Sequence, residues 1–249
     1  MEKANKQFFR AIKVICEKDM KIYYTKPPVL IFGFIFPVFL FFSFYLGKDL
    51  DIYTFFPGLL AMFLFFVASS VGPLITPWEK QAKTYERLLS FPTNINTIIL
   101  GDALAGMLFG VIINIIILLA GILFFNFSIS ILPLLLGMVT GTFCFSSLGV
   151  LLASPSTTAP SNVMMLSSLV RFPLIFISGI FVPLEELKGA GRVISYFSPI
   201  TYLVDILKFS FRQKNSNPLI LNLVILFGFT GIFLFLAHKF HKRNLMRGL

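Results

Sequence analysis

The sequence has 249 residues, of which 57% are hydrophobic and 13% are charged, and its mean hydropathy is +0.87. Soluble domains are roughly 45–50% apolar and about 25% charged, and a soluble fold of this size could not bury so much apolar side chain. The net charge of +10 resides in short segments between long apolar runs, with no basic–aromatic surface run of the kind that binds nucleic acid. The composition therefore excludes a nucleic-acid-binding domain and predicts an all-α, polytopic membrane protein.

Residues 1–28 predict an amphipathic helix that lies in the membrane interface. Basic residues recur every three or four positions between residues 3 and 13, while apolar residues such as Ile12 and Ile15 repeat on another face. Such a helix turns its apolar side toward acyl chains and its basic side toward lipid headgroups. Contact of a solvated helix with a partner protein is the alternative. We expect Pro27 to end the helix.

Residues 29–249 predict a single domain of six membrane-spanning helices. Pro37 predicts a kink in the first of them. Most of the 21 Lys and Arg residues fall in the N-terminal segment, the loop after the second span and the C-terminal tail, which places both termini in the cytoplasm of a multi-pass cell-membrane protein. Basic residues after the fifth span oppose this rule. The expected spans are 29–45, 53–75, 98–125, 131–152, 163–180 and 219–236.

Motifs for catalysis and metal binding are missing from the sequence. It has no G-x-x-x-x-G-K-[ST] phosphate loop, so this chain is not expected to bind and hydrolyse ATP by that route. We assign no catalytic residue and no metal ligand, because Cys16 and Cys144 lack metal or disulfide spacing. His238 and His241 are expected to be interfacial side chains.

The segment 78–90, between the second and third spans, predicts a polar helix that ends near Pro92. Its apolar residues offer anchors for a groove in a partner protein. Its charged residues suit the edge of that interface, where complementary charges fix how the helix is positioned in the groove. The residues that we single out are Glu79, Thr84, Tyr85, Glu86, Arg87, Leu88 and Leu89.

A second phrase follows the fifth span. Gly179 and Pro183 are expected to break that span early, and irregular backbone at membrane depth requires cover by protein or water. We therefore expect short re-entrant helices over about 181–218, with an ordinary loop as the alternative. The residues of this phrase are Ser178, Gly179, Pro183, Pro199, Thr201, Tyr202 and Asp205.

Together the two phrases resemble the ABC-2 family of ABC exporter permeases. That family has an acidic residue, a Thr, a Glu-Arg-Leu-Leu-like run, a Pro and a Gly in the first region, and Ser-Gly-x-Phe-x-Pro and Pro-x-Thr-Tyr phrases in the second. This sequence departs at Lys83, where the family usually has Gly. The resemblance implies that segment 78–90 is a coupling helix that docks in an ATPase subunit.

The resemblance also implies a homodimer, or a heterodimer with a like permease, bound to two ATPase chains that hold the ATP and Mg. This chain would have no cofactor of its own and would export an amphiphilic substrate such as a drug, lipid or lipid-linked glycan. An ion-coupled secondary transporter or a membrane scaffold protein is the alternative, although the spans offer few acidic residues for an ion site.

Arg171 is a charged residue inside the fifth predicted span. A charge at that depth costs at least about 2.5–3.5 kcal/mol on insertion scales, so it should face a cavity, a dimer interior or an acidic partner. It is a candidate for contact with an anionic substrate group. A structural role, in a pair with a carboxylate or with helix-end carbonyls, is equally compatible with the sequence. Asp102, near the start of the third span, is expected to be interfacial.

Overall fold

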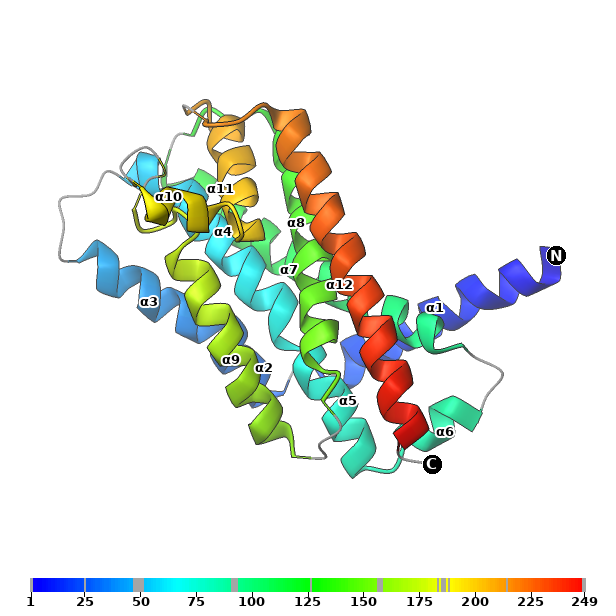
Figure 1. Ribbon diagram of the computed structural model, residues 1–249. Coiled ribbons are helices and arrows are strands. Elements are labelled where there is room, and N and C mark those ends of the chain that lie inside the picture. Colours follow the sequence, from blue (N-terminus) through cyan, green and yellow to red (C-terminus); the bar gives the residue numbers. More distant parts are fainter. Residues whose placement is uncertain are drawn as a thin grey trace.

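The computed structural model is a helical bundle, and no strand occurs in the part of the chain that it describes (Figure 1). It describes residues 2–24, 26–46, 52–90, 94–125, 127–155, 159–182, 184, 187, 189–213 and 215–247. The helices are α1 (Glu2–Ile22), α2 (Pro27–Leu30), the π-helix η1 (Ile31–Ile35), α3 (Phe36–Tyr45), α4 (Ile52–Ser70), α5 (Gly72–Gln81), α6 (Tyr85–Ser90), α7 (Ile95–Phe124), α8 (Ile131–Leu152), α9 (Pro160–Phe176), α10 (Ala190–Ser195), α11 (Pro199–Ser210) and α12 (Leu219–Arg247).

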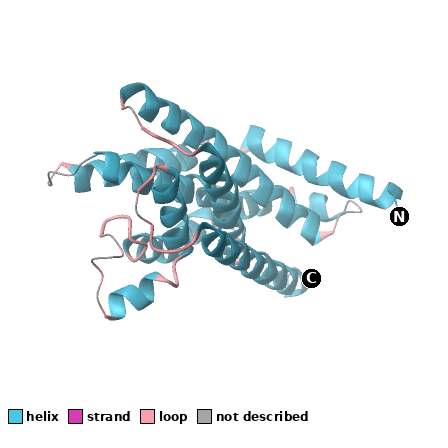
Figure 2. Cartoon of the chain, turned by 90° about the horizontal axis from the view of Figure 1, so that it is seen from above, coloured by secondary structure: helices cyan, strands magenta, loops and turns pink. Residues whose placement is uncertain are grey.

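The N-terminal helix α1 is confirmed, but it ends at Ile22 rather than at the prolines. Pro27 instead opens α2, because proline lacks only an N–H that has no partner in the first turn of a helix anyway. The chain bends by 88° between α1 and the segment that starts at α2. In the view from above, α1 runs out to the side of the bundle (Figure 2).

The irregularity predicted at Pro37 appears one turn earlier than the proline, as the π-helical turn η1. A proline ring collides with the carbonyl group four residues before it, here that of Gly33. A wider turn relieves that collision while α2, η1 and α3 continue as one segment.

Helix α4 lies at the centre of the bundle, and α7 and α12 lie at its periphery. In the most apolar 18-residue window of each span, 94% of the residues are buried for α4–α5 but only 17% for α7 and for α12. Peripheral helices with apolar outer faces are what a lipid environment permits.

Four helical segments within the described residues are long and apolar enough to cross a membrane, and a bent segment that combines α1 with α2–α3 could raise the number to five. The four are the continuous α4–α5 segment, α7, α8 and α12. Helix α9, with 17 residues, is shorter than these. The protein is therefore a polytopic helical membrane protein, and the count of six spans stays a prediction.

Close helix packing in the core depends on small residues. A Cβ atom added to Gly72, at the start of α5, would lie 2.6 Å from the carbonyl carbon of Gly149 in α8. The two backbones thus touch directly, as is typical of helix contacts in membranes.

The two ends of the bundle carry different elements. Helix α6 and the C-terminal end of α12 lie at one end, whereas α10, α11 and the connection into α12 lie at the other (Figure 1). The basic C-terminal tail predicted after the sixth span instead continues α12 to Arg247, since no proline or glycine occurs between Gly231 and that point.

Candidate functional site

The segment predicted as one helix over residues 78–90 is two helices joined by a tight turn. Helix α5 ends at Gln81, and Lys83 adopts a left-handed conformation with φ of 56°. The backbone N–H of Thr84 donates to the carbonyl oxygen of Glu79 at 2.9 Å, and that of Lys83 donates to Lys80 at 3.1 Å. This pair of bonds is a Schellman motif, whose left-handed position favours glycine.

Thr84 fixes the turn further, because its hydroxyl also donates to the carbonyl oxygen of Glu79, at 3.2 Å. Helix α6 then starts at Tyr85, and the N–H of Leu88 donates to the carbonyl oxygen of Thr84 at 3.0 Å. The left-handed residue explains the glycine that ABC-2 permeases usually have at this position. The prediction of an unbroken helix here was wrong.

A buried ionic cluster joins α5 to α1. The Lys18 ammonium forms ion pairs with the Glu79 carboxylate and with Asp19 Oδ1, the latter at 3.0 Å. Glu79 is 2% exposed and Asp19 is fully buried. The Tyr23 hydroxyl lies 3.5 Å from Glu79 Oε1. A pair with so little water around it is sensitive to loss of either partner.

Asp102, on α7, extends this cluster. It is 5% exposed, so its side chain is covered by protein, a burial that the sequence reasoning did not foresee; its position at the membrane interface stays a prediction. Its carboxyl lies beside that of Asp19, and the adjacent Gly101 lets α1 approach: a Cβ there would lie 2.6 Å from Ile15 Cγ2. Apart from the Lys18 ion pair, both oxygens of Asp19 and Oδ1 of Asp102 lack a hydrogen-bond partner among the described residues.

Burial and neighbouring charges shift the pKa values of the cluster residues in opposite directions. Burial raises the pKa of the Asp19 carboxyl above its ordinary value, even though Lys18 is beside it. Burial alone would lower the pKa of Lys18, but the charges of Asp19 and Glu79 hold that pKa above its ordinary value. Lys18 is therefore charged at neutral pH, and it bridges carboxyl groups from two helices.

Aromatic rings cover the cluster on the side of the α1–α2 turn. Tyr23 stacks on Trp78 with ring centroids 5.7 Å apart, and the Lys26 ammonium lies 4.2 Å from the centroid of the Trp78 ring. Across the α5–α6 turn, the Lys80 ammonium lies 5.7 Å from the centroid of the Tyr85 ring. Cation–π contacts of this kind help to fix the orientation of neighbouring segments.

The predicted docking residues differ in how exposed their side chains are. Tyr85 is 5% exposed and Glu79 faces α1, whereas Arg87 is exposed and Leu88 is half-buried. The side chains of Glu86 and Leu89 lie outside the described residues. The sequence reasoning missed Lys18, Asp19 and Asp102. Asp19 follows Ile12 and Ile15 on the buried face of α1, and that spacing was the available signal.

The second predicted phrase forms a set of capped turns. Helix α9 ends at Phe176, Ser178 donates to the carbonyl oxygen of Ile175 at 2.6 Å, and Gly179 has φ of +79°. Pro199 occupies the first turn of α11, where it needs no N–H. Pro183 lies outside the described residues. The predicted short helices are present as α10 and α11.

Thr201 and Tyr202 hold α11 against α10. The Thr201 hydroxyl donates to the carbonyl oxygen of Ser195 at 2.6 Å, and the Tyr202 hydroxyl donates to that of Tyr196 at 2.9 Å. Ser198 ties the same corner to α9, through a bond of 2.9 Å to the carbonyl oxygen of Leu174. These polar residues satisfy backbone groups at a helix corner that would otherwise be buried without partners.

Asp205 caps the turn that leads into α12. Its carboxylate is 2% exposed and accepts hydrogen bonds from the backbone N–H groups of Ser216 and Asn217, at 2.6 and 2.8 Å, and from the Asn222 side chain at 2.8 Å. Charge-assisted bonds to backbone N–H groups are the stronger kind. Asp205 therefore connects α11 to α12.

Arg171, on α9, is 1% exposed and faces the break between α4 and α5. Its Nη1 donates to the Ser70 hydroxyl at 3.0 Å, its Nε donates to the Ser167 carbonyl oxygen at 3.4 Å, and its guanidinium carbon lies 6.0 Å from the Phe66 ring centroid. No carboxylate of the described residues forms an ion pair with it. These two hydrogen bonds use two of the five N–H donors of the guanidinium.

Long apolar helices around a buried centre, a polar turn and buried ionic cluster at one end, and capped short helices at the other define a membrane subunit of a transporter. The sequence pattern described as "ABC-2 type transporter" matches residues 10–211. The chain belongs to this family.

Curated relatives agree with this assignment. The chain is 24% identical, over 170 residues, to the inner membrane transport permease YadH of Escherichia coli K12, and equally to YadH of Escherichia coli O157:H7 and of Shigella flexneri. Each match covers 68% of this chain and 66% of the relative, slightly less than two thirds of the relative's length. The protein is thus similar to multi-pass permeases of a cell membrane.

Proposed function

We propose that this chain is the membrane subunit of an ATP-driven exporter whose ATPase is a separate chain. The observation that carries the proposal is the α5–α6 turn, which lies at the same end of the bundle as α1 and the end of α12 and is tied to α1 by the Lys18–Glu79 ion pair. In this arrangement, α6 docks on the ATPase and both termini are cytoplasmic.

The ionic cluster supplies the mechanical link. A force on α6 reaches α5 through the Schellman turn, and α5 passes it to α1 through Lys18 and to α8 through the contact between Gly72 and Gly149. Packed helices move as units because close-packed interiors transmit strain. The inward-facing Glu79 holds α5 to α1, whereas the exposed Arg87 on α6 is the residue that we expect the partner to contact, together with the half-buried Leu88.

The assembly that we propose contains two copies of the permease, or this chain and a like permease, with two ATPase chains that bind ATP and Mg. The substrate is amphiphilic, such as a drug, lipid or lipid-linked glycan, because the spans carry few charges for a polar route. Arg171, a buried cation without a carboxylate partner among the described residues, is the group that we assign to an anionic part of this substrate.

Co-purification tests the docking role. A phosphate-loop ATPase should copurify with the full chain, and Arg87→Glu should reduce its yield by about tenfold, since reversal of an interfacial charge costs on the order of 1–2 kcal/mol. The matched control is Arg192→Glu, an exposed charge on α10 at the opposite end. Equal ATPase yield from the wild type and Arg87→Glu would overturn the docking assignment.

Cysteine labelling in intact cells tests the orientation independently. Cys16 and Cys144 are both buried, so a membrane-impermeant maleimide should react mainly with an introduced cysteine. Lys83→Cys should stay unlabelled until the cells are opened, whereas Arg192→Cys should react in intact cells. The reverse pattern would contradict the proposed topology.

Substrate-stimulated ATP hydrolysis tests Arg171. Arg171→Gln should reduce the stimulation while basal hydrolysis and expression stay unchanged. Stimulation that is unchanged in this variant would leave Arg171 with a structural role through Ser70.

A further inference from the structure

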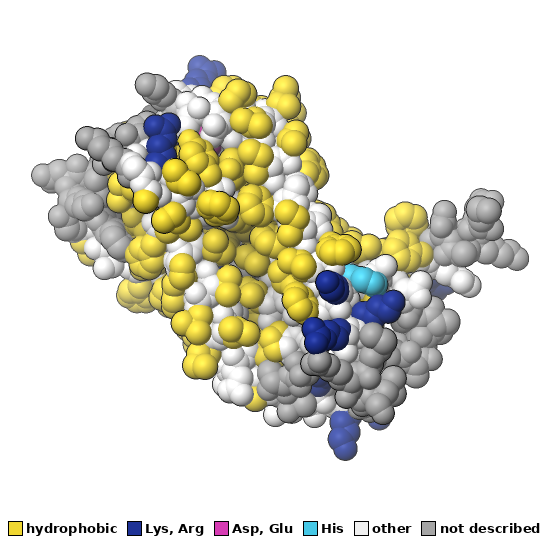
Figure 3. All heavy atoms as spheres, in the orientation of Figure 1, with side chains coloured by type: hydrophobic (Ala, Val, Ile, Leu, Met, Phe, Trp, Pro, Cys, Tyr) yellow, Lys and Arg dark blue, Asp and Glu magenta, His cyan; other side chains and the backbone are white. Residues whose placement is uncertain are grey.

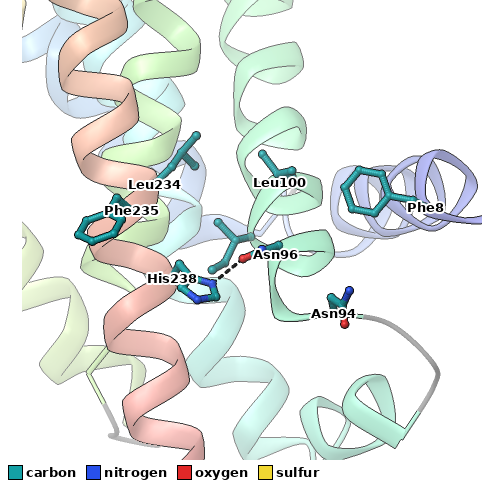
Figure 4. A pocket seen from close by; sticks show the side chains of 8 residues that line it. Phe8, Asn94, Asn96, Leu100, Leu234, Phe235 and His238 are labelled. Atoms are coloured by element: carbon teal, nitrogen blue, oxygen red, sulfur yellow. Dashed lines mark hydrogen bonds between the residues drawn. The ribbon is translucent and has the colours of Figure 1, made fainter. Parts of the chain in front are cut away.

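A second candidate site lies away from the α5–α6 turn, between α1, the start of α7 and the C-terminal half of α12. A cavity of about 380 Å³ opens there. Figure 4 shows its side chains converging from the three helices, with Phe8 on one wall and Leu234 and Phe235 on the other. The lining residues are Phe8, Asn94, Asn96, Ile99, Leu100, Leu234, Phe235 and His238.

The cavity is lined by both apolar and polar side chains. Its polar side consists of Asn94, Asn96 and His238, and His238 Nδ1 is hydrogen-bonded to Asn96 Oδ1 (Figure 4). Asn94 is the N-cap residue of the 30-residue helix α7, and its side chain makes no capping bond. The N-terminus of a long helix adds a positive field at this edge.

A strongly basic stretch of α12 follows the polar side directly. Lys239, Lys242 and Arg243 are exposed within one and a half turns of His238, and the sequence of α12 contains no Asp or Glu. Figure 3 shows Lys and Arg side chains gathered beside a histidine at this end, below a broad apolar face. The surface thus presents several positive charges next to an apolar cavity.

The apolar wall of the cavity continues along the outside of the bundle. On α7, Leu108 and Ile112 are 44% and 47% exposed, and on α12, Phe227 and Ile232 are 59% and 54% exposed. In a membrane protein such outward-facing residues contact acyl chains. A ligand at the cavity can therefore place a charged group at the basic residues and a long apolar chain along α7 and α12.

We propose that this cavity binds an anionic phospholipid of the surrounding membrane. The phosphate lies at Lys239, Lys242 and Arg243, with the Asn94 and Asn96 amides as further donors, and the first acyl carbons lie against Ile99, Leu100 and Leu234. Positive side chains at a membrane surface attract anionic lipid, and the cavity adds an apolar pocket to that attraction. The site is independent of the exported substrate and of the ATPase.

Lipid binding to the purified full chain in detergent tests this site. Native mass spectrometry should show phosphatidylglycerol retained in preference to phosphatidylcholine. Lys242→Gln should weaken phosphatidylglycerol binding about fivefold, and the triple Gln variant of Lys239, Lys242 and Arg243 should weaken it about 100-fold, which corresponds to a fivefold effect for each charge. Arg192→Gln, at the opposite end, is the matched charge control and should change nothing.

A second variant separates a lipid site from a site for free phosphate. Leu100→Trp fills the cavity without a change of charge and should abolish phosphatidylglycerol binding, whereas Leu169→Trp, at a 64% exposed position on α9 that does not line the cavity, should not. Glycerol 3-phosphate, the headgroup without chains, should not compete at millimolar concentration. Thermal unfolding without added lipid checks the fold of each variant, and Lys242→Gln and Leu100→Trp decide the question if the triple variant fails to fold.

Three outcomes would overturn the proposal. Equal retention of phosphatidylcholine would mean unselective lipid contact. Competition by glycerol 3-phosphate, with no effect of Leu100→Trp, would mean a site for a soluble anion. Equal losses in Lys242→Gln and Arg192→Gln would mean that net charge alone, rather than this cavity, attracts the lipid.

Discussion

The two partners of the Lys18–Glu79 ion pair should contribute unequally to stability. Removal of the Lys18 ammonium should lower the free energy of unfolding more than removal of the Glu79 charge. In Lys18→Met, the 2% exposed Glu79 side chain keeps, among the described residues, the Tyr23 hydroxyl at 3.5 Å as its one partner. Breaking a buried pair from one side costs about 3–5 kcal/mol. We expect about 3 kcal/mol, because the Lys18 side chain is 23% exposed.

Glu79→Gln should cost less, about 1 kcal/mol, since Lys18 keeps Asp19 at 3.0 Å and an amide still accepts a hydrogen bond. The double variant Lys18→Met/Glu79→Gln should be less destabilised than the sum of the single variants, with a coupling energy of about 1–2 kcal/mol. This non-additivity follows from the removal of the orphaned charge together with its partner.

Thermal unfolding in detergent measures these differences, at roughly 2–4 °C for each kcal/mol in a chain of about this size. Lys18→Met should thus unfold about 6–12 °C below the wild type. The control is Lys13→Met, which breaks an exposed pair with Glu17 at 3.7 Å and should shift the midpoint by about 2 °C or less. Equal shifts for Lys18→Met and Lys13→Met would refute the reasoning.

Three further predictions use the same unfolding assay. Lys83→Gly should stabilise the protein by up to about 1 kcal/mol, because glycine removes left-handed strain, whereas Lys83→Ala keeps its Cβ and should give no gain; a gain in both would contradict this explanation. Asp205→Ala should cost about 2 kcal/mol and speed amide exchange at Ser216, because buried N–H groups lose their acceptor; unchanged exchange would exclude the cap. Since folding raises the pKa of Asp19, its contribution to stability is present at low pH and is lost as pH rises from the ordinary carboxyl pKa of about 4 through the folded-state pKa, so Asp19→Asn should gain on the wild type over that rise in pH, and a pH-independent difference would argue against it.

The helical class and the positions of most long helices could be predicted from the sequence, because apolar runs and prolines act locally. The run over 131–152 predicts α8 with the bounds that the structure has, Ile131–Leu152, and Pro37 predicts an irregular first span. The break inside 78–90 could not be predicted in this way. Lysine is a good helix former, so Lys83 gives no local sign of its left-handed conformation.

The ionic cluster was beyond the sequence reasoning because its partners are far apart in the chain. Lys18 and Glu79 are 61 positions apart, and Asp102 stands at the edge of an apolar run, which favours an interfacial position when it is read alone. His241 is a similar case, because nothing in the sequence indicated its contact with α8: it is 6% exposed and its Nε2 lies 3.1 Å from the Val150 carbonyl oxygen. Burial of such polar residues depends on which helices pair.

The π-helical turn at Ile31–Ile35 sets which side of α3 meets lipid. Such a turn holds one residue more than an α-helical turn, so every later side chain is rotated by about 100° from the place that an unbroken α-helix would give it. With the extra residue, Phe41 is 7% exposed in the core, whereas Phe42 is 49% exposed. Deletion of one residue from that turn would move Phe42 into the buried position of Phe41 and Phe41 into the half-buried position of Leu40, while leaving the composition of the span almost unchanged.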